Sequence, residues 1–266
     1  MVFDLASSRW LVTGASSGLG RSLVFELASR GASSIELAAR RKERLVEVAD
    51  QVASLHGVEA SVNVTDLASA AEIPLLVDAV EARGPVNGLA LNAGVTYYGK
   101  HGDMTASEIE QMVGTNVTGP LLLLDAFISR LRDPKGDSAV LIVSSTAGDV
   151  AVPYEAAYSG TKAFLTTFGL AVREELADEQ VSVTVFSPAG INTEMISNTG
   201  LAAKFADHRS LMDPDQSAKM AVDAVAAGKA ISYPGVYAKV GNLNRRLLPR
   251  TLNTSVLKRV YRPTTD

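Results

Sequence analysis

The segment Trp10–Gly31 constrains the fold of this chain more than any other. The apolar run Trp10–Val12 predicts a short strand, and Arg21–Gly31, with apolar residues at helical spacing, predicts a helix. Between them lies the glycine-rich turn Thr13–Gly20, which reads TGASSGLG. Glycines permit a tight turn and close approach of a pyrophosphate, and the helix N-terminus adds N–H groups and a partial positive charge. Strand, glycine turn and helix in this order predict a dinucleotide-binding unit.

The rest of the chain alternates between predicted strands and helices. This alternation indicates a Rossmann-type α/β fold, a doubly wound parallel sheet with helices on both faces. The run Ala139–Val143 is apolar throughout, as a strand buried on both sides requires. We expect one domain over residues 1–236 and a C-terminal extension over 237–266. Strands are predicted at 9–13, 34–39, 58–64, 86–91, 138–144, 181–187 and 230–233, and helices at 18–30, 41–55, 67–83, 105–131, 155–179 and 214–227.

A second motif carries acid–base chemistry. Tyr158 and Lys162 stand four residues apart in a predicted helix, so their side chains lie on one face, one turn apart. An ammonium beside a phenol favours the phenolate, and we expect it to lower the tyrosine pKa toward neutrality, where tyrosine serves as a general acid or base. Ser145, thirteen residues before Tyr158, offers a hydroxyl to a carbonyl or alcohol oxygen. Because such pairs also occur on exposed helices, this motif gains its weight from the nucleotide signature upstream.

With these two motifs in place, residues 8–195 resemble the short-chain dehydrogenase/reductase family. The matching motifs follow one another in the family's order: TGASSGLG at 13–20, Asn92-Ala93-Gly94, Asn116–Gly119, the set Ser145, Tyr158 and Lys162, and Pro188–Thr193. The resemblance implies an oxidoreductase that transfers hydride between a nicotinamide and a carbonyl or secondary alcohol. A catalytically silent protein of the same fold that senses dinucleotides is the alternative, although an intact proton donor favours the enzyme.

The resemblance also assigns roles to four catalytic residues. Tyr158 is expected to give its proton to the forming alkoxide, and Ser145 to orient the same oxygen. Lys162 is expected to lower the pKa of Tyr158 and to hold the nicotinamide ribose. Asn116 is expected to anchor a water that links the lysine to solvent, although a buried asparagine that satisfies nearby backbone is the simpler interpretation of that residue alone.

The coenzyme-binding positions are likewise implied by the resemblance, with two departures from the family pattern. Asn63 stands where the family usually has an aspartate that accepts from the adenine amino group, and we expect its amide oxygen to accept instead. Ala189 takes the place of the glycine that usually follows Pro188. The implied positions are Gly14, Ser16, Ser17, Gly18, Leu19, Gly20, Arg40, Arg41, Asn63, Val64, Asn92, Ala93, Gly94, Tyr158, Lys162, Pro188, Ile191 and Thr193.

The end of the second predicted strand indicates which coenzyme is preferred. An acidic residue there would bind the ribose 2′-hydroxyl of NAD and repel a 2′-phosphate. Ala39 fills that place, and Arg40 follows it. Because arginine can hold a phosphate with two donors and stack on an adenine face, we predict a preference for NADP(H).

Composition excludes several other classes of protein. The chain has no cysteine, which excludes disulfides and thiolate metal sites, and its three histidines are scattered, so no metal site is expected. No signal-like segment opens the chain and no apolar run reaches the ~18 residues of a membrane span, which makes the cytoplasm the expected location. A net charge of −4 does not favour nucleic-acid binding.

Residues that could contact a small-molecule substrate lie in two segments. Residues 194–212 mix apolar and charged side chains where relatives carry a substrate lid, and this pattern suits either a partly apolar substrate or a packed surface loop. Thr96, Tyr97 and Tyr98 follow the Asn-Ala-Gly motif and are candidates for the pocket wall. Neither segment indicates one particular substrate.

The C-terminal extension is basic, with seven Lys or Arg and one acid over residues 237–266. We favour a flap over the substrate site or a subunit contact, in which its leucines and Val256 are mostly buried. A basic surface that meets an anionic membrane is the less favoured alternative, and a disordered tail is the least favoured. The long apolar helices predicted at 105–131 and 155–179 indicate at least a homodimer, since relatives pair these helices across a two-fold axis, and a tetramer is a further possibility.

Overall fold

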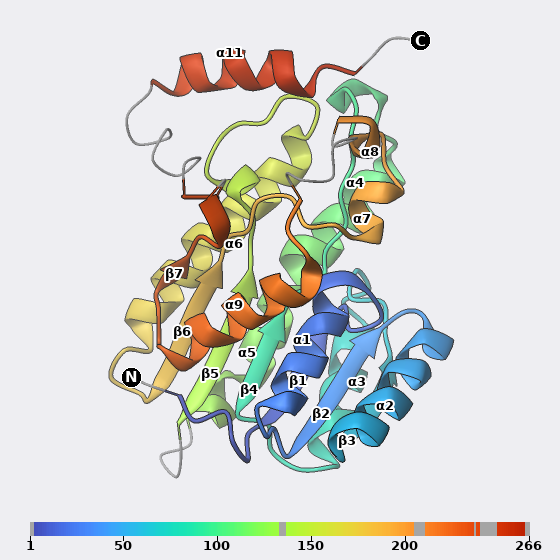
Figure 1. The fold of residues 1–266 in the computed structure, drawn as a ribbon, viewed down its shortest axis with the longest axis vertical. Coiled ribbons are helices and arrows are strands. Elements are labelled where there is room, and N and C mark those ends of the chain that lie inside the picture. The colour runs from blue at the N-terminus through green and yellow to red at the C-terminus, as the bar shows by residue number, and fades with distance from the viewer. Residues whose placement is uncertain (1–2, 133–136, 205–210, 237, 240–248, 264–266) are drawn as a thin grey trace.

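Seven parallel strands form the sheet at the centre of the molecule (Figure 1). The computed structural model describes residues 3–132, 137–204, 211–236, 238–239 and 249–263. In space the strands follow the order β3-β2-β1-β4-β5-β6-β7, so the chain runs outward from β1 to one edge and then from β4 to the other. The ligand crevice of such a sheet lies where this direction reverses. The strands are β1 (Arg9–Thr13), β2 (Ser34–Ala39), β3 (Glu59–Val64), β4 (Gly88–Leu91), β5 (Ser138–Val143), β6 (Val181–Phe186) and β7 (Ile231–Ser232).

Helices cover both faces of the sheet because its strands are apolar on both sides. In β1, Trp10 and Val12 point into one buried cluster and Leu11 into the other. The first cluster is completed by α1 (Gly18–Ser29), α2 (Lys42–His56) and α9 (Pro214–Ala226). The second is completed by α3 (Glu72–Glu81), α5 (Gly119–Leu131) and α6 (Ala156–Glu175). This confirms the predicted doubly wound α/β architecture.

The helix predicted at 105–131 is interrupted in its middle. It consists of α4 (Ala106–Val113), a π-helical turn η2 (Gly114–Thr118) and α5. A Cβ on Gly114 would lie 2.9 Å from the backbone of Ala68, and one on Gly119 would lie 2.6 Å from the carbonyl oxygen of Leu67. The two glycines therefore let the loop after β3 press against the widened turn, a kind of turn that is frequent at functional sites.

The run Ala106–Leu131 is the one helical stretch of the described residues that is long and apolar enough, by length and composition, to cross a membrane. Core helices of soluble proteins have the same composition, and here Leu123, Leu124, Phe127 and Leu131 are buried against the sheet. Leu122, on another side of α5, remains 36% exposed. Packing on the sheet therefore accounts for part of the apolar character of this run, of whose most apolar window 44% is buried.

Two segments lie over the carboxyl ends of the strands. Between β6 and α9 the chain forms two short helices, α7 (Glu194–Ser197) and α8 (Leu201–Lys204). The last helix, α11 (Arg250–Tyr261), crosses above the body (Figure 1). The phenol of Tyr98 donates to the carbonyl oxygen of Tyr261 at 2.7 Å and ties the end of α11 to the loop after β4.

The apolar residues of α11 are less buried than expected. Leu252 is 49% exposed and Val256 is 51% exposed, so the prediction that they are mostly buried is wrong for the single chain. The reason is geometric, because α11 contacts the body along one side only (Figure 1). Leu243, Leu247 and Leu248, to which the same prediction applied, lie outside the described residues.

Candidate active site

A cavity of about 680 Å³ opens at the carboxyl ends of the strands, within the size range of small-molecule sites. Its walls come from the loops that follow the first six strands, β1 to β6, and from one side of α11. The glycine turn, the Asn-Ala-Gly motif, Ser145, Tyr158 and Lys162 all line this cleft. The topology thus brings together residues that are spread over most of the chain.

The glycine turn is shaped by close contacts that leave no room for side chains. A Cβ on Gly20 would lie 2.2 Å from the carbonyl oxygen of Gly14 and 2.5 Å from Nδ2 of Asn92. Gly14 and Gly18 have φ angles of +69° and +52°, in the left-handed region that favours glycine. Asn92 is held in place because its Nδ2 donates to the carbonyl oxygen of Thr13 at 2.9 Å.

The N-terminus of α1 offers donors to an anion. Ser17, which precedes the helix, makes no side-chain hydrogen bond to its first turn. The first N–H groups of a helix have no partner within the helix, so those of Gly18, Leu19 and Gly20 face the cleft as donors. This cradle fits the pyrophosphate of a nicotinamide dinucleotide.

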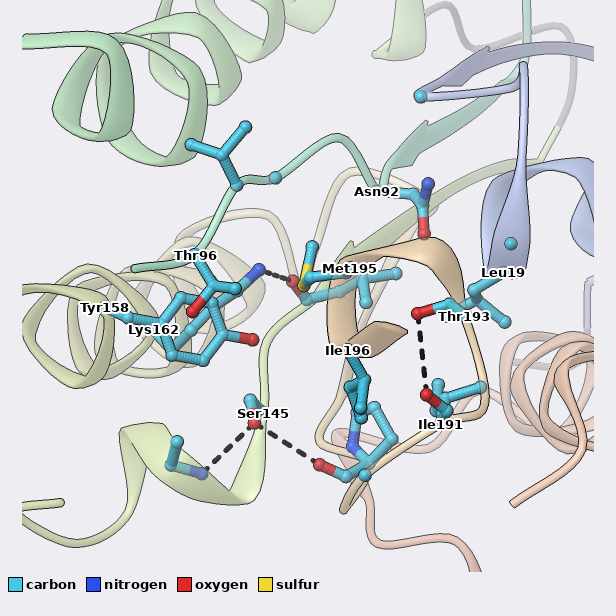
Figure 2. Close-up of a pocket in the computed structure, with 18 of the residues that line it drawn as sticks. Leu19, Asn92, Thr96, Ser145, Tyr158, Lys162, Ile191, Thr193, Met195 and Ile196 are labelled. Carbon is cyan, nitrogen blue, oxygen red and sulfur yellow. Dashed lines mark hydrogen bonds between the residues drawn. The ribbon is translucent and has the colours of Figure 1, made fainter. Parts of the chain in front are cut away.

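The catalytic candidates converge where β5 meets α6 (Figure 2). The Ser145 hydroxyl accepts from the backbone N–H of Ala147 at 3.1 Å and lies 3.5 Å from the carbonyl oxygen of Pro188. Its neighbour Ser144 donates to the carbonyl oxygen of Lys162 at 2.8 Å. This bond fastens the end of β5 to α6 and fixes Ser145 relative to Tyr158 and Lys162.

The electrostatics of the pair differ from the sequence prediction. Burial raises the pKa of Tyr158 above the ordinary tyrosine value, and the carboxyl of Glu155 raises it further, whereas the Ser145 hydroxyl lowers it. Burial also lowers the pKa of Lys162 to about 8. The prediction that Lys162 brings the pKa of Tyr158 toward neutrality is wrong, because burial of the phenol dominates the shift. The Nζ of Lys162 donates to the carbonyl oxygen of Val143 at 2.9 Å and stands 5.8 Å from the centroid of the tyrosine ring. A raised pKa keeps the phenol protonated at neutral pH.

Asn116 has a different environment from the one its family role implies. It is fully buried in the π-helical turn, where its Oδ1 accepts from the N–H of Val95 at 2.8 Å. Its Nδ2 donates to the carbonyl oxygen of Val95 at 2.9 Å and to Oγ1 of Thr161 at 3.0 Å. Asn116 does not line the cleft, and its amide joins the loop after β4 to α6. Anchoring of a water by this residue stays a prediction.

Three arginines lie at or near the end of β2, and the preference for NADP(H) stays a prediction. Arg40 lines the cleft and is exposed, and its guanidinium makes no hydrogen bond or ion pair with the described residues. Arg41 donates to Oγ of Ser17 at 2.6 Å and to Oγ of Ser16 at 3.2 Å. Arg41 also pairs with Glu194 at 2.8 Å, and Arg44, which the sequence analysis missed, pairs with the same carboxylate.

The last two residues of β3, Asn63 and Val64, do not reach the cleft. The Nδ2 of Asn63 donates to Glu36 at 2.8 Å and its Oδ1 accepts from Arg83 at 2.5 Å, so the amide belongs to a buried ionic network. Neither Asn63 nor Val64 lines the cavity, and the predicted acceptor for the adenine amino group is thus engaged elsewhere. Thr65, Asp66 and Leu67 line it instead. Their position directly after the end of β3 could have identified these three residues, because ligands of such sheets bind beyond the carboxyl ends of the strands.

The segment that follows β6 and the loop after β4 complete the walls of the cleft. Pro188, Ile191 and Thr193 line the cleft as predicted, and Thr193 Oγ1 donates to the carbonyl oxygen of Ile191 at 3.4 Å (Figure 2). Thr96 also lines it, whereas Tyr97 does not and Tyr98 contacts α11. The sequence analysis missed Glu155, Asn253, Leu257 and Tyr261, all of which line the cleft.

Residues 9–203 match the family described as short chain dehydrogenase. The chain belongs to the short-chain dehydrogenase family. This short-chain dehydrogenase is similar to SadH, named as an oxidoreductase of Mycobacterium tuberculosis strain H37Rv, with 30% identity over 250 residues that cover 90% of each chain. It is also similar to 3-dehydrosphinganine reductase TSC10B of Arabidopsis thaliana, with 28% identity over 226 residues that cover 82% of this chain and 67% of the relative.

A solved structure shares the fold of this short-chain dehydrogenase. A short-chain dehydrogenase of Sphingobium yanoikuyae in complex with NADPH aligns with a TM-score of 0.80 and 23% identity, covering 97% of this chain and 98% of the other. The family predicted from the sequence is therefore confirmed. The short-chain dehydrogenase is an oxidoreductase that acts on CH–OH or C=O groups.

Proposed function

We propose that this short-chain dehydrogenase is an NADP(H)-dependent carbonyl reductase with Tyr158 as the proton donor. One observation carries the proposal: a phenol with a raised pKa, a serine hydroxyl and a lysine line the same cleft as a glycine cradle and an arginine that has no partner among the described residues. When bound, the nicotinamide supplies or accepts the hydride. A dinucleotide-sensing protein would need the cradle and the arginine but no buried proton donor.

Each catalytic side chain has a task that its contacts support. Tyr158, kept neutral by burial, donates its hydroxyl proton to the oxygen that becomes the alcohol. Ser145 holds that oxygen by a hydrogen bond, since its hydroxyl lies at the end of β5 beside the phenol. Lys162 contributes a buried ammonium, which donates to the carbonyl oxygen of Val143 and would hold the ribose hydroxyls of a bound coenzyme.

The preference for NADP(H) follows from the charges around the end of β2. Ala39 brings no carboxylate to repel a 2′-phosphate, and Arg40 brings a guanidinium that has no partner among the described residues. A charge-assisted hydrogen bond to phosphate contributes about 1.5–3 kcal/mol, or about one to two decades in affinity. Similar proteins have been solved with NADPH and with NADH, so this preference rests on Arg40 and Arg41.

Substrates of this enzyme are proposed to be bulky and partly apolar. The part of the cleft between the lid and α11 is lined by Met195, Ile196, Leu201, Val256 and Leu257. Apolar walls of this kind favour a hydrocarbon framework around the reacting carbonyl, at about 25 cal/mol per Å² of apolar surface buried.

The enzyme is also proposed to work as a homodimer through α5 and α6. Leu122 and Phe164, one on each helix, are 36% and 37% exposed, and Phe164 stacks on Phe168 with ring centroids 5.6 Å apart. Exposed apolar side chains on neighbouring helices favour association. Light scattering at micromolar concentration checks this proposal, and a strictly monomeric mass would refute it.

The function is tested by following oxidation of NADPH with a panel of bulky ketones. Tyr158→Phe should lower turnover by on the order of 10²–10⁴-fold while the NADPH dissociation constant stays close to that of the wild type. Tyr97→Phe is the matched control, because Tyr97 lies outside the cleft lining. Arg40→Ala should weaken NADPH far more than NADH. Near-normal turnover of Tyr158→Phe would remove the proton donor from the proposal, and equal effects of Arg40→Ala on both coenzymes would remove the NADP(H) preference.

A further inference from the structure

Glu155 is a buried carboxyl group in the wall of the catalytic cleft. It immediately precedes α6, one turn before Tyr158, and is 6% exposed. Its side chain makes no capping hydrogen bond to the first turn of α6, so the start of the helix does not depend on the carboxyl group. Burial of an ionised carboxyl group costs folding free energy unless the group is paired, so a buried glutamate without a strong partner is unusual.

A second glutamate of the same chain shows what a paired buried carboxylate looks like. Glu36 is 2% exposed and accepts from Arg9 at 2.5 Å, from Arg83 at 2.6 Å and from Asn63 at 2.8 Å. Glu155 accepts one hydrogen bond, from Oγ1 of Thr96 at a long 3.3 Å, and makes no ion pair with the described residues. Glu36 is therefore satisfied by the fold, whereas Glu155 has spare acceptor capacity.

The spare capacity faces the cleft. Glu155 lines the cavity together with Thr96, Tyr158 and Tyr261, beside the apolar wall formed by Val152 and Leu257. Burial raises the pKa values of Tyr98, Tyr158 and Tyr261, and the nearby carboxyl group of Glu155 raises them further. Burial raises the pKa of Glu155 itself to about 7. The cleft thus holds a buried acceptor with spare capacity between phenols and an apolar wall, three residues before the proposed proton donor.

We infer that Glu155 recognises the substrate by accepting a hydrogen bond from a hydroxyl or ammonium group that the substrate carries close to its reacting carbonyl. The inference rests on the proposed function for the identity of the reacting group. Glu155 stands at the N-cap of α6, three residues before Tyr158, and both side chains line the cleft, so a donor on the carbon next to the carbonyl, or one carbon further, is placed to meet Glu155 while the carbonyl oxygen meets Tyr158. The substrate class is therefore a bulky ketone with an adjacent hydroxyl or amino group.

The pH dependence of binding distinguishes the two kinds of donor. The phenols that face Glu155 from the loop after β4, from α6 and from α11 have pKa values raised above the ordinary tyrosine value and stay neutral between pH 6 and pH 8 (about one unit on each side of the Glu155 pKa). Lys162, with a pKa of about 8, titrates at the upper end of this range. An ammonium-bearing ketone should therefore bind more tightly as the pH rises through about 7, where Glu155 ionises. A hydroxyl-bearing ketone should show a weaker dependence.

The test compares three ketones with one hydrocarbon framework that carry a hydroxyl, an amino or a methyl group beside the carbonyl. Their dissociation constants are measured by calorimetry on full-length enzyme saturated with NADP⁺, which cannot reduce them. We expect the amino ketone to bind about tenfold to a hundredfold more tightly than the methyl ketone, the range of a charge-assisted hydrogen bond. Glu155→Gln keeps the size of the side chain and an acceptor for Thr96, and should abolish most of that preference and its rise with pH.

Glu174→Gln is the matched control, because Glu174 is an exposed glutamate on the same helix. It should keep the wild-type preference. An unchanged preference in Glu155→Gln, or no preference in the wild type, would show that the carboxyl group is structural only and would overturn the inference. Turnover of the same ketones with NADPH is measured separately, so a failure of the proposed reductase activity is distinguishable from a failure of recognition by Glu155.

Discussion

Lys162 is a buried ammonium, and its replacement by methionine should stabilise the protein. Lys162 is 3% exposed, and its Nζ makes one hydrogen bond, to the carbonyl oxygen of Val143. Methionine has a similar length and no charge, so Lys162→Met removes the cost of burying the ammonium without leaving a large cavity. An enzyme that keeps such a residue for its chemistry gives up stability at this position.

The size of the effect follows from the lysine pKa. Burial lowers it from 10.5 to about 8. At about 1.4 kcal/mol per pKa unit, this corresponds to about 3 kcal/mol of unfolding free energy lost at neutral pH. Loss of the donor to Val143 offsets about 1 kcal/mol of the gain in the variant. The net gain of about 2 kcal/mol should raise the melting temperature by roughly 4–8 °C.

The sign of the pH dependence gives a second check. Between about pH 8 and pH 10.5 the unfolded chain keeps the lysine proton and the folded chain has lost it, so wild-type stability gains over that interval. The methionine variant lacks this gain of about 3 kcal/mol, so the wild type should overtake it within this interval and be about 1 kcal/mol more stable by about pH 10.5. Thermal unfolding of the coenzyme-free proteins across this range measures both quantities. Lys219→Met, at an exposed position of α9, should change stability by less than about 0.5 kcal/mol. A methionine variant less stable than the wild type at pH 7, with a parallel pH curve, would refute the reasoning.

Two further outcomes are expected. Gly20→Ala places a Cβ 2.2 Å from the carbonyl oxygen of Gly14, so it should lower the free energy of unfolding by about 1–3 kcal/mol and weaken NADPH binding at least about tenfold. Thermal unfolding and calorimetry measure the two effects. Gly160→Ala is the control, because its Cβ meets nothing within 4 Å and the change should be neutral or slightly stabilising. Deletion of residues 249–266 removes Leu257 and Tyr261 from the cleft wall and should raise the KM for bulky ketones while leaving the NADPH dissociation constant near the wild-type value; steady-state kinetics that show an unchanged KM would contradict a role for α11 in the substrate wall.

Features that depend on neighbours in the sequence were predictable. The strands, the glycine turn and the helical spacing of Tyr158 and Lys162 follow from local patterns. The structure places the glycine turn and these two side chains at the carboxyl ends of the strands, as expected. The pKa of Tyr158 was mispredicted because the pattern gives the spacing of the two residues but not their burial. In the folded chain desolvation outweighs any influence of the ammonium 5.8 Å from the ring centroid.

Features that depend on distant contacts were not predictable. Asn63 turns away from the cleft because Glu36 lies on the neighbouring strand and Arg83 follows α3, a pairing with no local signal. The widened turn around Asn116 arises from close packing of two glycines on the loop after β3. Glu155 reads as an ordinary helix-start glutamate, and its burial becomes visible only when the loop after β4 and α11 have been placed around it.

The contact between Thr13, Gly20 and Asn92 has a consequence for how such sequences are recognised. The Asn92 amide donates to the carbonyl oxygen of Thr13, and the Thr13 hydroxyl accepts from the N–H groups of Asn92 and Ala93 at 2.9 and 3.1 Å. The same amide leaves no space for a side chain at Gly20. The glycine turn and the Asn-Ala-Gly motif are therefore two parts of one hydrogen-bonded contact between the ends of β1 and β4. A motif search that scores them as independent signatures counts a single steric constraint twice.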